Sequence, residues 1–351
     1  MHQFILQRLK YGILVQLLAI IGITSLIYLS PVDPSRLTFG QRADAGTLRA
    51  KRTALGLDAP LPLQLVWYLN DLSPLAWHAQ PQLAAEPYSY VTLVTVAQSS
   101  FVLQKPYLRT SFQTGRQVSS LLAAAIPKTA ILAILAMLGA TILGVGLGVV
   151  AALRRNSWLD SALNGWAVLG VSLPSYVVSL LLAFAFAYLL RDYTGLPLRG
   201  GLYEIDAHGV EYLAWRNVVL PAIALGMRPV ALILSLTRAA MLEVLALDYV
   251  RTARAKGLPE RLVILKHALR NALNPIVTAI SGWLAGLLTG AFFVETVFGY
   301  DGVGSLTVNA LLNYDLPVVL GTVLFSATVF IILNLITDLL QYWLDPRLRL
   351  L

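Results

Sequence analysis

The chain has 351 residues, of which 57% are hydrophobic and 13% are charged, and it carries a formal net charge of +8. Soluble domains carry about a quarter of their residues as charged side chains, so this composition excludes an ordinary water-soluble fold and indicates an integral membrane protein. The absence of cysteine excludes disulfides and thiolate metal sites, and no basic stretch has the interleaved aromatic residues typical of nucleic-acid binding.

Six stretches of the chain reach the length of about 20 mostly apolar residues that a membrane-spanning helix needs. They lie near residues 9–29, 121–152, 158–190, 217–240, 276–298 and 317–343. Arg8 and Lys10 precede the first stretch, but its apolar run is longer than that of a signal peptide and no small-residue cleavage site follows it. We therefore expect an all-α polytopic membrane protein with about six transmembrane helices, in which residues 1–30 form an uncleaved N-terminal helix.

Basic residues predict the orientation of these helices. Arg154 and Arg155 follow the second span, the loop 241–275 holds a cluster of basic side chains, and Arg347 and Arg349 end the chain. The connections between these regions are acidic: residues 191–215 contain four acidic residues and residues 299–316 contain two. Because short loops rich in Arg and Lys stay on the cytoplasmic side, we expect both termini in the cytoplasm.

Residues 31–114 form a long segment after the first span that is too polar to cross the membrane. Its basic residues do not contradict an extracytoplasmic location, since segments longer than about 60 residues translocate regardless of charge. The stretch Tyr88–Val96 is rich in β-branched and aromatic residues, which predicts a strand. A seventh span over residues 88–103 is the alternative, but it would place every later loop on the wrong side.

The chain lacks the patterns of a membrane enzyme or an ATPase. No phosphate-binding GxxxxGK[ST] loop surrounds any lysine, and the four histidines are far apart without metal-ligand spacing. His208 lies among Glu204, Asp206 and Glu211, where a solvated acidic loop is a better interpretation than a metal site. We expect no catalytic residue, cofactor or metal on this chain.

Candidate pathway residues come from polar or helix-breaking positions inside the spans. Arg228 is the deepest charged residue, and it either lines a pathway or pairs with a carboxylate. In SLPSY, residues 172–176, Pro174 frees a backbone carbonyl within the third span, which suits a cavity wall or a packed kink and makes Ser172 and Tyr176 candidates as well. The second span carries small residues typical of close helix packing rather than of a nucleotide-binding loop, at Gly144, Gly146 and Gly148.

The loop 241–275 has internal structure of its own. Asp248 is expected to cap a short helix over 249–256, and Gly257 suits the left-handed position after that helix. Pro259 fits the first turn of a second helix, which Asn274-Pro275 is expected to end. An apolar stripe along this second helix is predicted at Leu258, Leu262, Leu265, Leu269 and Ala272.

A basic amphipathic helix lying on lipid headgroups is the alternative interpretation of this loop. It would explain the charge, but not the compact helix–Gly–Pro–helix arrangement or the small residues Ala253 and Ala255.

The stretch DYVRTARAKGLPERLVILKHALRNALNPIVT, residues 248–278, resembles the cytoplasmic coupling loop, or EAA motif, of permease subunits of ABC importers for dipeptides, oligopeptides and nickel. Further similarity occurs in FILQRLKYGILVQLLAI, LGLDAPLPLQLVWYLNDL and AFFVETVFGYDGVGSL, and together these segments resemble the B-type partner of a heterodimeric pair. Departures from the family pattern lie on the outer side: PVDP at residues 31–34, an insertion near 74–106, and Asp301 where proline is usual.

The resemblance implies a type I ABC importer transmembrane domain over residues 115–345, in the inner membrane of a bacterial cell. It implies partners as well: a homologous second permease, two ABC ATPase subunits that bind ATP and Mg²⁺, and an extracytoplasmic solute-binding protein. The expected docking element on the ATPase consists of Asp248, Tyr249, Arg251, Thr252, Ala253, Arg254, Ala255, Lys256, Gly257 and Leu258. An ion-coupled carrier acting without an ATPase is the main alternative, and a membrane-anchored enzyme or assembly factor is a third. The sequence leaves the cargo open.

Overall fold

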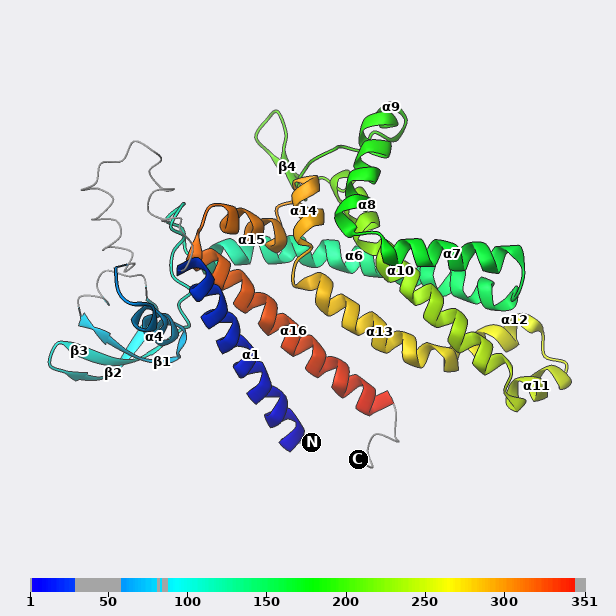
Figure 1. Ribbon diagram of the computed structural model, residues 1–351, viewed down its shortest axis with the longest axis horizontal. Coiled ribbons are helices and arrows are strands. Elements are labelled where there is room, and N and C mark those ends of the chain that lie inside the picture. Colours follow the sequence, from blue (N-terminus) through cyan, green and yellow to red (C-terminus); the bar gives the residue numbers. More distant parts are fainter. Residues whose placement is uncertain (1, 29–57, 81–82, 84–87, 345–351) are drawn as a thin grey trace. The chain divides into compact units, whose positions relative to one another are not determined.

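The computed structural model describes residues 2–28, 58–80, 83 and 88–344. The PVDP segment at residues 31–34 and the terminal Arg347 and Arg349 therefore lie outside the described residues. The chain forms two compact units, which are treated separately below: Met1–Ala125 with Leu306–Thr328 (unit 1), and Ile126–Ser305 with Val329–Leu351 (unit 2). The ribbon is shown in Figure 1.

Unit 1 combines membrane helices with a small sheet. Helix α1 (His2–Tyr28) and the first part of α16 (Leu316–Leu344) pack against the short helix α4 (Leu61–Leu72), where Ile20, Tyr68 and Leu320 form a buried cluster. The sheet has the antiparallel order β1-β3-β2, with bounds Leu75–Ala79 for β1, Tyr90–Val96 for β2 and Ser99–Gln104 for β3. The predicted strand at Tyr88–Val96 is thus confirmed, and the alternative of a seventh span over residues 88–103 is wrong.

Unit 2 is built around α10 (Arg216–Leu245), which packs against α7 (Trp158–Ser172), α8 (Ser175–Leu182) and α13 (Arg270–Leu288). The π-helical segments η2 (Ala183–Leu189) and η3 (Val263–Leu269) continue α8 and precede α13. The remaining elements are short: α9 (Arg191–Thr194), β4 (Tyr203–Ile205), β5 (Glu211–Leu213), α11 (Asp248–Ala255), α12 (Glu260–Leu262) and α14 (Phe292–Phe298). Helices α6 (Val118–Leu153) and α15 (Val303–Leu312) each contribute residues to both units.

Most of the expected spans are present, with altered limits. Within the described residues four helices are long and apolar enough to cross a membrane: Val118–Leu153, Arg216–Leu245, Glu260–Leu288 and Leu316–Leu339. The pair α7 and α8–η2 makes a fifth if it is counted as one span. Helix α1 covers the first expected span, and its shorter apolar part runs over Lys10–Ser25.

Two expected spans are interrupted. The prediction of a continuous third span over 158–190 is wrong, because the chain bends by 107° between α7 and α8. The change of direction is visible in Figure 1. Leu173 and Pro174 adopt extended conformations at this bend, so Pro174 precedes α8 instead of lying within a helix. The fifth span is also wrong in its limits: the helix ends at Leu288, and α14 is a separate element.

Glycines on α6 permit its close approach to α10. A Cβ at Gly144 would lie 2.7 Å from Ile233 Cβ, and one at Gly148 would lie 2.5 Å from Thr237 Cβ. The packing prediction is confirmed at these two positions. It is wrong at Gly146, where a Cβ would meet nothing within 4 Å.

This difference provides a matched test of helix packing. Gly148→Ala should lower the thermal unfolding temperature of the detergent-solubilised protein, because overpacking a close contact costs about 1–3 kcal/mol. Gly146→Ala adds the same methyl group in open space and replaces glycine with a better helix former, so it should leave the unfolding temperature unchanged or raise it slightly. Equal destabilisation by the two substitutions would contradict the assigned contact.

Candidate coupling loop and translocation cavity

The segment after α10 folds into a compact helical turn. Two residues separate the end of α10 at Leu245 from the start of α11 at Asp248, and Gly257, two residues after the end of α11, has a φ of +72°. The Gly257 amide donates to the carbonyl of Arg254 at 2.9 Å, and the Leu258 amide donates to that of Ala253 at 3.4 Å. This is the hydrogen-bonding pattern of a left-handed helix end, so the prediction for Gly257 is confirmed.

The predicted caps of this turn are wrong in detail. Leu247, not Asp248, occupies the N-cap of α11, and no side chain donates or accepts a capping bond there. Asp248 instead lies in the first helical turn, 3.5 Å from the Arg251 guanidinium, where its charge suits the positive end of the helix. Pro259 is likewise the N-cap of α12 and not part of its first turn.

The apolar stripe predicted for the second helix is correct only in part. Ala272 is fully buried and Leu258 and Leu269 are half-buried on the same cluster, but Leu262 and Leu265 are exposed and Val263 and Ala268 are buried instead. The cause is the π-helical segment η3, in which each turn holds an additional residue and shifts the side chains around the axis. A stripe drawn at a constant period of 3.6 residues therefore misses the buried face at Leu262 and Leu265.

Asn274-Pro275 does not end the helix, contrary to the prediction. Helix α13 continues through Pro275 to Leu288. Ala272 and Ile276, on either side of this proline, are both fully buried and belong to two different apolar clusters. Continuous helix packs both residues at once, and membrane helices tolerate proline where neighbouring groups satisfy the freed carbonyl.

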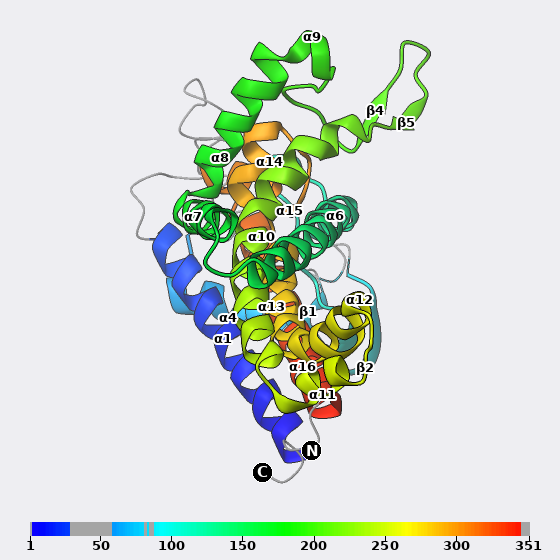
Figure 2. The ribbon, with the colours of Figure 1, turned by 90° about the vertical axis from the view of Figure 1, so that its right-hand side faces the viewer.

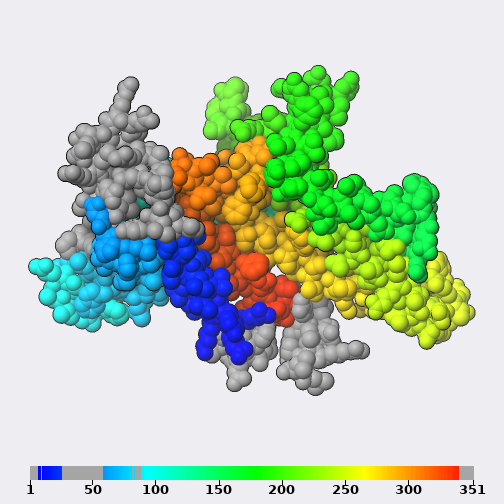
Figure 3. Space-filling model, in the orientation of Figure 1, coloured from blue at the N-terminus to red at the C-terminus, as the bar shows by residue number. Residues whose placement is uncertain are grey.

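Helix α11 presents one apolar and one polar face. Val250 and Ala253 are buried against α10 and η3, so the expectation that Ala253 is available to a partner is wrong. Apart from the half-buried Leu258, the other residues of the expected docking element are exposed: Asp248, Tyr249, Arg251, Thr252, Arg254, Ala255, Lys256 and Gly257. Figure 3 shows this region, in yellow-green and yellow, on the surface of unit 2.

Polar bonds hold α11 against the segment that leads into α13. Arg254 forms two bonds to the carboxylate of Glu260, at 2.7 and 3.2 Å, and this ion pair raises the pKa of Arg254. The Tyr249 hydroxyl accepts from Asn271 Nδ2 at 2.7 Å and donates to the carbonyl of His267 at 3.3 Å. Figures 1 and 2 both show α11 beside α12 at the end of α10. These bonds link α11, which precedes Gly257, to residues that follow Gly257 and lead into α13.

An ion pair between the buried Asp160 and the partly buried Arg238 joins the start of α7 to α10. Arg238 donates to both carboxylate oxygens of Asp160, at 2.6 and 2.7 Å, and Asp160 also accepts from the Asn156 amide at 3.0 Å and from Asn164 Nδ2 at 2.8 Å. Asp160 is only 3% exposed. This cluster fixes the last two turns of α10, which lead directly into the coupling turn.

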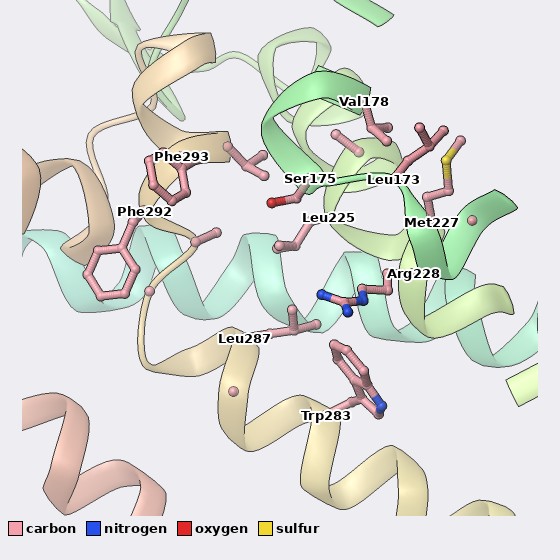
Figure 4. A pocket seen from close by; sticks show the side chains of 16 residues that line it. Leu173, Ser175, Val178, Leu225, Met227, Arg228, Trp283, Leu287, Phe292 and Phe293 are labelled. Atoms are coloured by element: carbon pink, nitrogen blue, oxygen red, sulfur yellow. The ribbon is translucent and has the colours of Figure 1, made fainter. Parts of the chain in front are cut away.

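A cavity of about 280 Å³ lies where the two interrupted spans meet α10. Leu173 and Ser175 line it from the α7–α8 bend, and Gly290 and Ala291 line it from the break before α14. Arg228 enters it from α10, with its guanidinium 5.9 Å from the ring centre of Trp283 on α13 (Figure 4). Arg228 forms no ion pair with any residue that the structure describes, so its predicted alternative of pairing with a carboxylate is not observed.

The other predicted pathway residues fall at different places. Pro174 lies in the bend itself, between the cavity-lining Leu173 and Ser175. Tyr176 is 46% exposed and its ring centre lies 6.1 Å from that of Phe293. Ser172 donates to the carbonyl of Val168 at 2.8 Å and is not among the cavity residues. Sequence reasoning missed Trp283 and the 289–291 break, although Gly286 and Gly290 around the break were visible signals.

The acidic residues near His208 stabilise the β4–β5 hairpin. Asp206 accepts from the His208 and Val210 amides at 2.8 and 2.9 Å, and Glu204 accepts from Tyr212 at 2.8 Å. The hydrogen bonds from Asn217 and Tyr212 lower the pKa of Glu204. In the part of the chain that the structure describes, no group of three or more His, Asp or Glu side chains is arranged to hold a metal ion.

The fold is that of the transmembrane domain of a type I ABC importer. A structure of the MetNI methionine ABC transporter in an inward-facing conformation matches with a TM-score of 0.53 at 16% identity, over 65% of this chain and 97% of that chain. At this identity the match concerns the fold alone.

Sequence comparison adds the family. Residues 144–350 match the family "binding-protein-dependent transport system inner membrane component", and residues 1–133 match its N-terminal counterpart. The chain is 33% identical to the probable D,D-dipeptide transport system permease protein of Escherichia coli (strain K12), over 98% of this chain and 97% of that protein. It is 34% identical to the glutathione transport system permease protein of Pectobacterium atrosepticum, over 99% of both chains.

The chain belongs to the family of binding-protein-dependent transport system inner membrane components. It is a permease subunit of an ABC importer and a multi-pass protein of the bacterial inner membrane. Full-length similarity to such permeases favours this function over an ion-coupled carrier.

The Asp160–Arg238 pair gives a test of how the coupling turn is anchored. Asp160→Ala leaves the Arg238 guanidinium without its partner, and should destabilise the protein by up to about 3 kcal/mol because Arg238 is largely buried. The measurement is thermal unfolding of the detergent-solubilised chain. Arg251→Ala removes a long, exposed ion pair and serves as the control, with little expected change. An unfolding temperature of Asp160→Ala equal to that of the control would contradict the anchoring role.

Proposed function

We propose that this chain forms half of the membrane pathway of a peptide importer, and that the turn from Tyr249 to Leu258 docks on a cytoplasmic ATPase subunit. The chain would pair with a homologous second permease, and two ATPase chains would supply ATP binding and hydrolysis. An extracytoplasmic binding protein would deliver the cargo. Peptides are favoured as cargo because relatives that match nearly the full length carry the names of D,D-dipeptide, dipeptide and glutathione permeases.

The observation that carries the docking proposal is the two-faced construction of α11. Its apolar side chains Val250 and Ala253 are buried on α10 and η3, which leaves a polar, basic surface free for a partner. Arg251 and Lys256 are exposed on this surface, and acidic groups on an ATPase would complement them. Movement of α11 would be transmitted to α13 through the bonds of Arg254 and Tyr249.

Gly257 tests this coupling. Its φ of +72° strains a side-chain-bearing residue by about 1–2 kcal/mol, and a β-branched residue tolerates it least. Because a Cβ there would touch nothing within 4 Å, Gly257→Val should disturb the turn without disturbing the packing of the spans. In proteoliposomes containing the complete importer, we expect ATP-driven peptide uptake to fall several-fold at unchanged membrane insertion.

Gly257→Asn is the matched control, since asparagine adopts left-handed conformations more readily. It should retain most of the uptake. Wild-type uptake by Gly257→Val would count against a docking role for this turn.

The cavity at the interrupted spans is the proposed cargo passage. Arg228 is exposed near the middle of a 30-residue spanning helix, and a charged side chain at such a depth is stable only next to water, a counter-charge or cargo. A peptide supplies such a counter-charge through its terminal carboxylate, which pairs well with a guanidinium. The apolar lining, including Trp283 and Phe293, would accommodate side chains of varied shape.

Replacement of Arg228 tests this role. Arg228→Met should reduce uptake of a dipeptide about tenfold, as expected for loss of roughly 1.4 kcal/mol of charge interaction, and should affect its C-terminally amidated analogue much less. Arg228→Lys should keep part of the preference for the free carboxylate. Met227→Leu, a neighbouring cavity residue, is the control for changes of shape without charge. An equal loss for both cargoes would argue against carboxylate recognition by Arg228.

A further inference from the structure

The three-stranded sheet of unit 1 has one uncovered apolar face. The strand register places Trp77 beside Phe101 and Val94, and Leu75 beside Leu103 and Val91. Val91 is 64% exposed and Val94 is 54% exposed, and most of their neighbours on this side are similarly open. We call this surface the outer sheet face; it consists of Leu75, Trp77, Val91, Val94, Val96, Phe101 and Leu103.

On the opposite face, β1 and β3 are closed by a polar network that fixes the sheet on the end of α4, whereas β2 is exposed on both sides. His78 lies 2.9 Å from Gln104 Oε1, and both side chains are buried. Gln104 Nε2 donates to the backbone carbonyls of Asn70, Asp71 and Ser73 at 3.0 to 3.1 Å. The outer sheet face is therefore held in one orientation relative to α4.

The outer sheet face lacks the features that protect a sheet in water. Residues 88–104, which include β2 and β3, contain no charged side chain and no proline. β2 is an edge strand and all seven of its residues are exposed. Exposed edges in water-soluble proteins are normally interrupted by charges, proline or bulges, and this edge has only one register shift, near Thr92 and Val94. Such a surface requires a cover.

The position of α4 indicates what the cover is. Tyr68 of α4 packs on Ile20, which lies about 12 Å along α1 from its end at Tyr28, since each helical residue adds about 1.5 Å. It also packs on Leu320, in the second turn of α16. Helix α4 thus packs on two apolar helices of unit 1, and its side chains Val66 and Trp67 are exposed.

We propose that the outer sheet face rests on the outer leaflet of the bilayer, at the boundary between headgroups and acyl chains. Trp67 and Trp77 have the amphipathic rings that gather at membrane interfaces. Lipid is favoured over a protein partner because the face offers apolar area without charges, and because it adjoins helices that are themselves in lipid.

Cysteine labelling tests this inference directly, because the natural chain has no cysteine. The full-length protein with Val94→Cys, carrying a nitroxide spin label and reconstituted in lipid nanodiscs, should be accessible to oxygen, which concentrates in lipid, and shielded from a water-soluble nickel chelate. A label at Thr95→Cys, the next residue on the opposite side of β2, is the matched control and should be several-fold more accessible to nickel. Ile142→Cys on α6 and His208→Cys in the β4–β5 turn provide lipid and water references.

Two results would overturn the proposal. A Val94 label as accessible to nickel as the His208 label would place the face in water. A label protected from both reagents would show that protein covers it, from this chain or from a partner.

A second measurement avoids any disturbance by the label. Lipids brominated near the headgroup quench nearby tryptophan, so Trp77→Phe should reduce the quenched fraction of the fluorescence of the chain. An unchanged fraction would contradict contact between the outer sheet face and lipid.

Discussion

The membrane requires every backbone amide and carbonyl within it to find a partner, and the architecture of unit 2 follows from this constraint. Helical backbone is interrupted at Leu173-Pro174, between α7 and α8, and at residues 289–291, between α13 and α14. Both interruptions line the same cavity, together with Arg228. Irregular backbone and a charged side chain are each costly in lipid. In this fold both occur at one cavity, whose lining is mostly apolar apart from Arg228 and Ser175.

The orientation of the coupling turn depends on the π-helical segment η3. The π-helical segment η3 rotates the following residues so that Val263, Ala268 and Ala272 all pack inward. That packing buries the apolar side of α11 and leaves its basic side exposed. A rigid attachment to α10 and α13 and an open polar face are therefore produced by the same set of contacts. This arrangement suits an element that binds a partner and transmits the movement of that partner to the membrane helices.

Proline had opposite effects at two positions that looked alike in the sequence. Pro174 marks a 107° bend, whereas Pro275 lies within a continuous helix. Local preference disfavours helix before both residues. Around Pro275, a continuous helix is stabilised because it buries Ala272 and Ile276 in two apolar clusters. At Pro174, the extended residue Leu173 lines the cavity and Pro174 adjoins it.

Composition and hydropathy by themselves determined the membrane class, the approximate spans, the strand at Tyr88–Val96 and the left-handed Gly257, because each depends on the solvent or on one residue's own conformational freedom. The match over residues 248–278 indicated the family, which full-length relatives then established. Tertiary structure alone decided where spans break, which face of α11 is free, that Arg228 meets Trp283, and that β1, β2 and β3 form a sheet with an exposed apolar face. These features depend on contacts between distant segments, and no local pattern specifies which segments will meet.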